Sequence, residues 1–124
     1  MIALLLTLEI LARVLVGECG PMGAPCQYLV ATSVQARLEA GTFGDSVPAV
    51  LTAYYGDAPA TESSRRMAWA LLTGRVPSLG LPYAYSAEDR ARHGWGPGDV
   101  VLSYWADDGI LELHLARRVP WGSE

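Results

Sequence analysis

The stretch LARVLVGECGPMGAPCQYLVATSVQARL, residues 11–38, decides the fold of this chain. It reads as an apolar helix, an elbow rich in glycine and proline, and a second apolar helix. We expect the first helix to span residues 3–16 and to stop at Gly17, because glycine commonly ends helices. Pro25 fits the first turn of a helix, where its missing N–H costs nothing. We therefore expect the second helix over residues 25–40.

Two shorter helices are predicted after the second helix. Asp45 or Ser46 is placed to cap a helix over VPAVLTAYY, residues 47–55, and Thr61 to cap a fourth helix ending at Gly74. We expect the packing face of the fourth helix to consist of Met67, Trp69, Ala70 and Leu71.

The C-terminal part of the chain changes to a strand pattern. YAYS, residues 83–86, reads as a short extended segment, and Ser86 resembles the cap of a helical turn that ends near Gly94. Residues 99–105 and 110–118 then alternate with period two and are joined by an Asp-Gly turn, which predicts a β-hairpin. Helices first and a hairpin last is the α+β pattern, and we expect one helix-dominated domain over residues 1–124.

Composition restricts the class of protein. Of the 124 residues, 51% are hydrophobic and 18% charged, which is ample for one core. The net charge of -4 without a basic patch argues against a nucleic-acid partner.

The apolar N-terminus has no basic leader region and is interrupted by Glu9 and Arg13, so we expect a buried core helix rather than a signal peptide or a membrane span. Glu9 and Arg13 lie one turn apart and are expected to pair weakly.

Two cysteines, Cys19 and Cys26, flank the elbow. They are consistent with a disulfide in an exported protein, and equally with two small buried side chains in a reducing compartment. Two thiols without a nearby histidine do not suit a metal site, so we expect neither a metal nor a cofactor.

Glu18 is the candidate catalytic residue. A carboxylate at a helix C-terminus meets the partial negative charge of the helix dipole, which together with apolar neighbours is expected to raise its pKa. A carboxyl group with a raised pKa is suited to general-acid catalysis near neutral pH. The ordinary alternative is a helix-terminal acid in solvent.

The sequence LARVLVGECG, followed by Gln27, resembles the cell wall hydrolase family that includes the spore-cortex-lytic enzymes. Members carry a pattern close to LAR-x-(I/V)-x-GE-A-x-G, then a glutamine nine residues after the glutamate, then a helix ending in an L-N-R-V-like tetrad. Here the tetrad reads QARL, residues 35–38, so the match runs without a gap over residues 11–38. Cys19 replaces the family's alanine, and Ala36 replaces the asparagine of the tetrad. PYAYS is a weaker match to the family's tyrosine-rich segment.

The resemblance implies a lysozyme-like fold and cleavage of peptidoglycan between N-acetylmuramic acid and N-acetylglucosamine, with Glu18 as the acid. A lytic transglycosylase needs no second carboxylate, unlike two-carboxylate glycosidases. The other acids read as caps, loop residues or part of a short turn: Asp45, Asp57, Glu62, Glu88 and Asp89. We therefore favour a lytic transglycosylase over a hydrolysing muramidase.

The same resemblance implies substrate-binding roles for Gln27, Tyr83 and Tyr85. Gln27 is placed to face Glu18 across the elbow. Tyr83 and Tyr85 share one face of an extended segment, where they can stack on sugar rings or cover the edge of the core. The expected partner is the glycan strand of the bacterial cell wall, and the protein is expected to be a monomer. We expect either a phage-encoded or virion-associated protein, as an endolysin is, or a domain of a longer exported protein.

Two other functions are kept open. Cys26 at a helix N-terminus, with His114 on a later strand, imitates a cysteine peptidase of the NlpC type. The Asp-Cys-Ser context of that family and the glycine-rich surround of its histidine are both missing here. Separately, Glu112 and His114 share one face of the last strand and are expected to form a solvated polar surface. The second alternative is a non-catalytic module that binds a cell wall or a virion.

Overall fold

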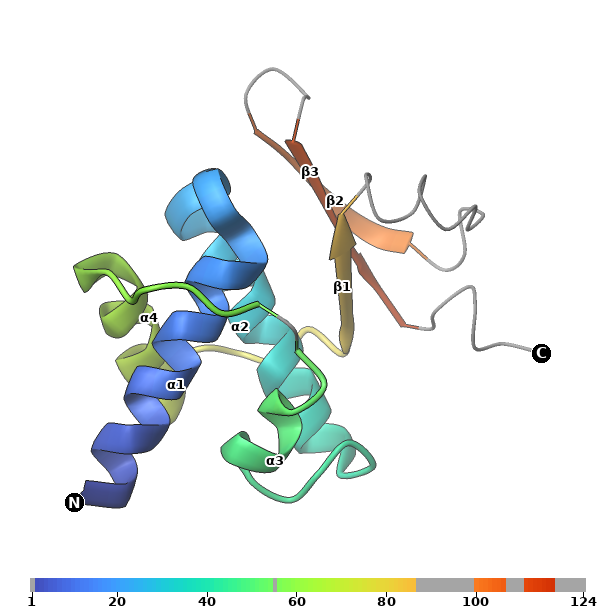
Figure 1. Cartoon of the computed structure of the whole chain (residues 1–124). Coiled ribbons are helices and arrows are strands. Elements are labelled where there is room, and N and C mark those ends of the chain that lie inside the picture. Colours follow the sequence, from blue (N-terminus) through green and yellow to red (C-terminus); the bar gives the residue numbers. More distant parts are fainter. Residues whose placement is uncertain (1, 55, 87–99, 107–110, 118–124) are drawn as a thin grey trace.

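A computed structural model describes residues 2–54, 56–86, 100–106 and 111–117 of the chain (Figure 1). Its elements, in chain order, are α1 (Ile2–Cys19), the 3-10 turn η1 (Gly20–Met22), α2 (Gly23–Ala40), α3 (Val47–Leu51), α4 (Glu62–Leu72), β1 (Tyr83–Ser86), β2 (Val100–Ala106) and β3 (Leu111–Ala116). The helices occupy one side of the molecule and the strands the other.

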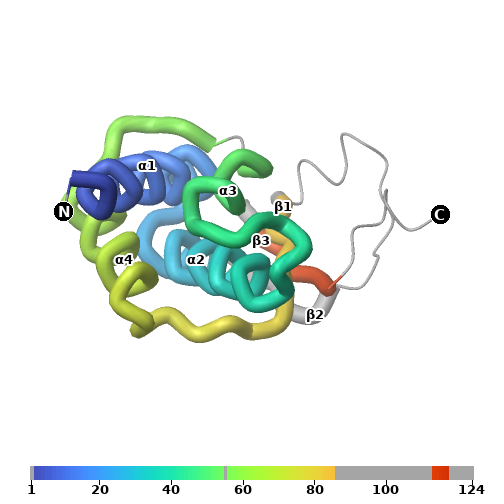
Figure 2. The backbone as a smooth tube through the Cα atoms, turned by 90° about the horizontal axis from the view of Figure 1, so that it is seen from below, coloured from blue at the N-terminus to red at the C-terminus, as the bar shows by residue number. Residues whose placement is uncertain are grey.

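Helix α1 is the centre of the helical part. It packs against α4, α2 and α3, and Figure 2 shows these helices beside it, with the strands at the far end of the helical part. Leu11, Ala12 and Leu15 of α1 are fully buried and meet Val30 and Val34 of α2 in the core. The second helix predicted from the sequence therefore contributes Val30 and Val34 to the core.

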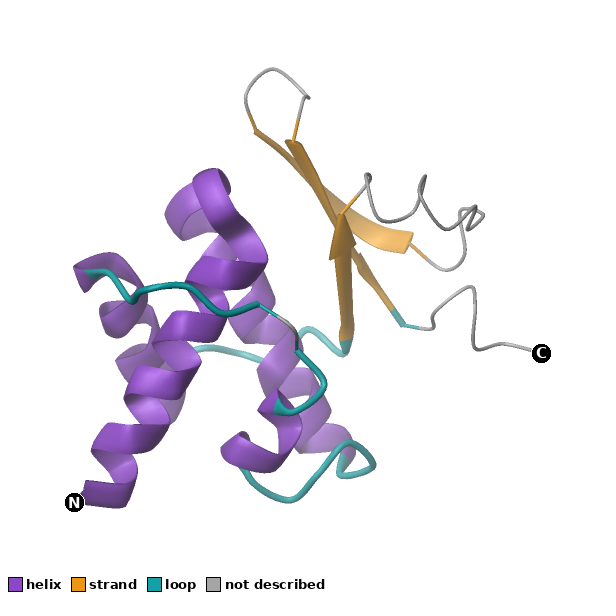
Figure 3. Ribbon diagram, viewed as in Figure 1, coloured by secondary structure: helices purple, strands orange, loops and turns teal. Residues whose placement is uncertain are grey.

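The three strands form one antiparallel sheet in the order β1-β3-β2 (Figure 3). The pairing of β2 with β3 confirms the predicted hairpin, while its Asp-Gly turn and the predicted turn near Gly94 lie outside the described residues. β1 pairs with the other side of β3, with Tyr83 opposite Ala116 and Tyr85 opposite His114. A helix-dominated α+β architecture with a C-terminal hairpin is thus confirmed.

Helix α1 does not end where the sequence predicted. It continues through Gly17 to Cys19, so Glu18 lies in its last turn and not beyond it. The start of α2 is also earlier than expected, at Gly23. The C-terminal end of α2 agrees with the prediction, since Gly41 has a φ of +77° and its N–H donates to the carbonyl of Arg37.

The first half of α1 corrects another expectation. The sequence predicted a buried core helix, but Ile2, Leu5, Leu6 and Ile10 are exposed. Leu8 packs partly against the core, and full burial begins at Leu11.

Glu9 and Arg13 form their hydrogen bonds with other elements. The expected weak pairing between them agrees with the pKa of Glu9, which is lowered mainly by Arg65 and to a smaller extent by the charge of Arg13. Glu9 accepts two hydrogen bonds from Arg65 of α4, and Arg13 bonds Asp57 in the segment between α3 and α4. In the part of the chain that the structure describes, no helix is both long enough and apolar enough to cross a membrane.

The two short helices carry the predicted caps. The Ser46 hydroxyl accepts the N–H of Ala49, although α3 ends at Leu51, earlier than the sequence suggested. Thr61 and Ser64 form a reciprocal capping box at the start of α4.

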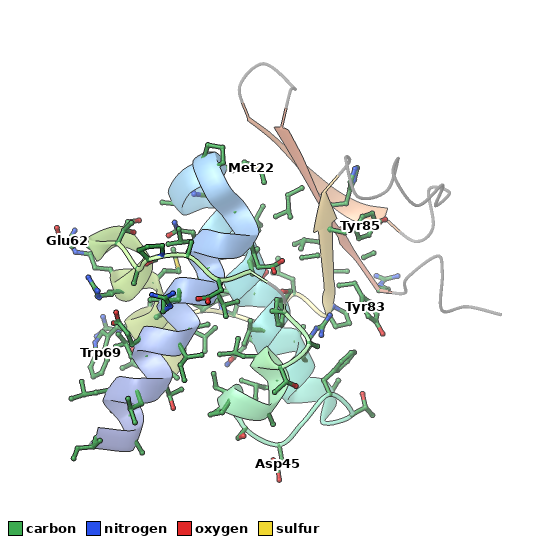
Figure 4. All side chains as sticks on the ribbon, in the orientation of Figure 1. Met22, Asp45, Glu62, Trp69, Tyr83 and Tyr85 are labelled. Atoms are coloured by element: carbon green, nitrogen blue, oxygen red, sulfur yellow. A yellow bond between two sulfur atoms is a disulfide. The ribbon has the colours of Figure 1, made fainter. Side chains whose placement is uncertain are left out.

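The predicted packing face of α4 is confirmed for Leu71, which is buried, and for Met67 and Ala70, which pack against the core, but it is wrong for Trp69. The buried residues of α4 are Ser64, Ala68 and Leu71, while Trp69 is 45% exposed on the outer side of the helix (Figure 4). Trp69 lies one position from Ala68, and 100° of rotation per residue is enough to turn it away from the core.

A disulfide between Cys19 and Cys26 closes the elbow between α1 and α2. Their Cα atoms are 5.7 Å apart, and both side chains are buried. Of the two states that the sequence left open, the structure has the oxidised one.

We expect loss of the disulfide to lower the free energy of unfolding by about 2–3 kcal/mol, the value for closing a short loop in the unfolded chain. The double variant Cys19→Ala/Cys26→Ala tests this in urea unfolding. The wild-type midpoint should fall when reductant is added, and the variant's midpoint should not respond. A wild-type midpoint that is insensitive to reductant would contradict the prediction.

Candidate active site

Glu18 lies half-buried in the last turn of α1, one residue before the disulfide. Its Oε2 accepts a hydrogen bond of 2.6 Å from the backbone N–H of Gly56. This donor comes from the segment between α3 and α4, 38 residues away in sequence. The carboxyl group is therefore oriented by a remote backbone group and is not a freely rotating acid in solvent.

The residues Gly56, Asp57 and Ala58, which we call the strap, lie against α1. Figure 1 shows the chain between α3 and α4 crossing this helix. Besides the bond to Glu18, Asp57 accepts a 2.8 Å bond from Arg13 Nε, and the Ala58 N–H donates to the Arg13 carbonyl at 3.2 Å. Three hydrogen bonds thus join the strap to one face of α1.

Two glycines permit the close approach of the strap and the helix. A Cβ atom on Gly17 would lie 2.0 Å from the backbone nitrogen of Asp57, and one on Gly56 would lie 2.4 Å from that of Glu18. Neither position can hold a side chain without moving backbone. The glycine of the GE pair is therefore required by this contact, and not by a helix end.

Tyr54 stands at the upstream end of the strap and was missed by the sequence analysis. Its hydroxyl is 2.8 Å from Ser33 Oγ on α2, and the Ser33 hydroxyl is also 2.6 Å from the carbonyl of Val30. Burial raises the pKa of Tyr54, and the nearby negative charge of Glu18 adds to this while Arg37 opposes it. Tyr54 and Glu18 therefore influence each other electrostatically.

Arg37 of α2 joins the helices to the sheet. The Cζ of its guanidinium lies 4.6 Å from the ring centre of Phe43, 4.7 Å from that of Tyr54 and 5.3 Å from that of Tyr83. Its Nε donates a 2.6 Å bond to the Pro82 carbonyl, just before β1. A planar cation suits this position because it can stack on several aromatic rings and bond a carbonyl in its own plane.

The two tyrosines of β1 share one side of the strand, as predicted (Figure 4). Tyr83 is half-buried and packs edge-on against Phe43 with ring centres 5.6 Å apart. Tyr85 is buried, with 6% exposure, and lies 5.4 Å from the ring of His114 on the paired strand. Of the two, Tyr83 has more surface to offer a ligand.

Gln27 is buried, with only 4% exposure, near the start of α2. Its Oε1 accepts a weak 3.4 Å bond from the hydroxyl of Ser63 on α4. That contact directs the amide toward α4 and leaves it little surface for a glycan. Its predicted role in substrate binding stays a prediction.

Cys26 and His114, the residues of the cysteine peptidase alternative, are not placed as that chemistry requires. Cys26 is in the disulfide and fully buried, so it has no thiol to act as a nucleophile. His114 is 4% exposed, which corrects the prediction that it belongs to a solvated polar face. The side chain of Glu112, the other residue of that predicted face, is not among those that the structure describes.

Within the described ranges, no group of three or more histidine, cysteine, aspartate or glutamate side chains is arranged to hold a metal ion. Comparisons of the chain with protein-family models, with curated proteins and with solved structures found no match.

We expect Gly17→Ala to destabilise the protein by about 1–3 kcal/mol, because its Cβ would collide with the strap backbone. The sign is diagnostic, since alanine in place of glycine inside a helix normally stabilises by about 0.5–1 kcal/mol. Urea unfolding of the variant measures the difference. A stability equal to or above that of wild type would show that the strap does not press on α1.

We expect Arg37→Lys to lower the free energy of unfolding by about 2–4 kcal/mol, because lysine keeps the charge but loses the planar stacking and the bond to Pro82. Arg75→Lys is the matched control. Arg75 is exposed, so its replacement should change stability by less than about 0.5 kcal/mol. Equal effects of the two substitutions in thermal or urea unfolding would contradict the role given to Arg37.

Proposed function

We propose that this chain is a lysozyme-like peptidoglycan-cleaving enzyme, and specifically a lytic transglycosylase with Glu18 as its single catalytic acid. The observation that carries the proposal is the position of Glu18, half-buried at the end of a core helix with its carboxyl group held by the Gly56 N–H. This glutamate stands in the GE pair of the motif that resembles cell wall hydrolases. A fixed, partly desolvated carboxyl group is what general-acid cleavage of a glycosidic bond requires.

The chemical step begins with proton transfer from Glu18. Because Oε2 accepts the Gly56 N–H, the proton is carried by the other carboxyl oxygen, Oε1. Glu18 donates this proton to the oxygen that links N-acetylmuramic acid to N-acetylglucosamine. The bond from C1 of muramic acid to that oxygen breaks, N-acetylglucosamine leaves as an alcohol, and C1 gains oxocarbenium character.

The second step closes the ring within the same sugar. The C6 hydroxyl of muramic acid attacks C1 and gives its proton to the Glu18 carboxylate, which restores the acid. The products are a 1,6-anhydromuramic acid end and a free N-acetylglucosamine end, and no water is consumed. One carboxyl group serves both steps.

Two of the described acids are engaged in ion pairs, which supports a single-acid mechanism over a two-carboxylate one. Asp57 is paired with Arg13, and Glu62 with Arg66. Both are exposed and are held by a cation, whereas an inverting glycosidase needs a second carboxylate free to activate water.

We assign the glycan contacts to the tyrosine whose side chain is more exposed. Tyr83, half-buried beside Phe43, offers its ring to a sugar face, and Tyr85 supports the same side of β1 through His114. Gln27 is proposed to assist in substrate binding from the start of α2, where its amide is buried and accepts a hydrogen bond from Ser63. The proposed partner is the glycan strand of the bacterial cell wall, bound by a monomer.

The test is mass spectrometry of the soluble products that wild type and Glu18→Gln release from purified peptidoglycan. We expect anhydromuropeptides from wild type and a loss of at least about 1000-fold in the variant, since glutamine is nearly isosteric but has no proton to donate. Circular dichroism of both proteins controls for folding.

The other outcomes discriminate the alternatives. Reducing-end products that depend on Glu18 would identify a hydrolysing muramidase. Equal activity of the two proteins would refute the role of Glu18. Binding to cell walls without release of any muropeptide would favour a non-catalytic interaction module.

A further inference from the structure

We propose that the ion pair between Arg13 and Asp57 is a positioning device for Glu18, which locks the strap on α1 so that the Gly56 N–H holds the catalytic carboxyl group. This inference rests on the proposed function for its effect on turnover. Its structural part, the dependence of the Gly56–Glu18 bond on the ion pair, can be measured without any activity.

The sequence positions explain how the lock works. Arg13 and Glu18 lie on the same helix, and Asp57 follows Gly56 directly in the strap. The Arg13–Asp57 bond of 2.8 Å and the Gly56–Glu18 bond of 2.6 Å thus join the same two pieces of backbone at neighbouring points. If Asp57 moves away from α1, Gly56 moves with it and the carboxyl group loses its donor.

The strap needs such a lock because regular secondary structure does not hold it. Its upstream neighbour Tyr54 is anchored to α2 through Ser33 and Arg37. Its downstream end is joined to α1 through Arg13, by the side chain to Asp57 and by the backbone carbonyl to Ala58. Arg13 therefore contributes both of the described hydrogen bonds on that side.

The exposure of the pair separates positioning from stability. The side chains of Arg13 and Asp57 are 43% and 68% exposed, and exposed ion pairs contribute little to folding, at most about 1 kcal/mol. Catalysis is far more sensitive, because a displacement of about 1 Å at a reacting group can reduce the rate on the order of 100-fold. Breaking the pair should therefore leave a folded protein with impaired chemistry.

The chain offers a matched control in the ion pair between Glu9 and Arg65. It also joins α1 to another element, its bond length is again 2.8 Å, and its side chains are 43% and 49% exposed. It lies one turn before Arg13 and bonds α4 rather than the strap. A general effect of removing a surface charge from α1 would appear equally in Glu9→Gln.

The experiment compares Asp57→Asn, Arg13→Gln and Glu9→Gln on purified peptidoglycan, together with the charge-swapped double variant Arg13→Asp/Asp57→Arg. We expect the first two to lower turnover by about 10- to 100-fold with little change in unfolding midpoint, and Glu9→Gln to match wild type. The double variant should recover a substantial part of the loss, because the attraction between the two positions is restored.

A further readout would not respond to a merely structural role. In amide hydrogen exchange, the Gly56 N–H should exchange faster in Asp57→Asn than in Glu9→Gln, because its bond to Glu18 is weakened.

The outcomes keep the two proposals apart. Wild-type turnover and wild-type exchange of the Gly56 amide in Asp57→Asn would overturn the positioning role. A wild-type protein that releases nothing from peptidoglycan, but whose Gly56 amide responds to Asp57→Asn, would refute the proposed function and leave the lock intact. No recovery in the charge-swapped variant, with Asp57→Asn impaired, would also overturn the ion-pair mechanism.

Discussion

The contact between Gly17 of α1 and Gly56 of the strap is the constraint on which the rest of the site depends. Two backbones approach there so closely that a single Cβ on either glycine would lie within 2.4 Å of backbone nitrogen. This approach brings the Gly56 N–H to the Glu18 carboxyl group and places Asp57 beside Arg13. A carboxyl group that would otherwise sample many rotamers is thereby confined to one arrangement, which is the form of preorganisation that acid catalysis uses.

Arg37 connects the strap and α2 to the sheet. Arg37 stacks on rings from three separate segments, one of which, Tyr54, leads into the strap and another, Tyr83, begins β1. Burying a guanidinium is costly unless it is bonded and surrounded by polarisable groups, and the Pro82 carbonyl with three aromatic faces provides both. Arg37 therefore contacts both Tyr83, the proposed glycan-binding residue, and Tyr54, which precedes the strap. These contacts fix the position of Tyr83 relative to the strap that holds the proposed acid.

Sequence reasoning proposed Glu18 as the acid but did not predict which groups surround it. Glu18 was identified from its place at a helix end and from the motif around it, and the caps at Ser46 and Thr61 were recognised from residue type alone. Tyr54 and Arg37 were not singled out, although Arg37 stands in the QARL tetrad of the second helix. The predicted face of α4 included Trp69 because large aromatic residues are usually buried, but the helix turns this ring to solvent.

The sequence by itself determined the elements: helix caps, the glycine at the end of α2, the tyrosine strand and the period-two hairpin. These are set by interactions between residues a few positions apart, which the order of residue types records directly. Only the tertiary structure decided what those elements do to Glu18. The Gly56 donor is 38 residues from the acid, and the Pro82 carbonyl is 45 residues from Arg37. The sequence does not distinguish a glycine that ends a helix from a glycine that allows another backbone to pass close by. The two differ only in the segment that packs against the glycine in the folded protein.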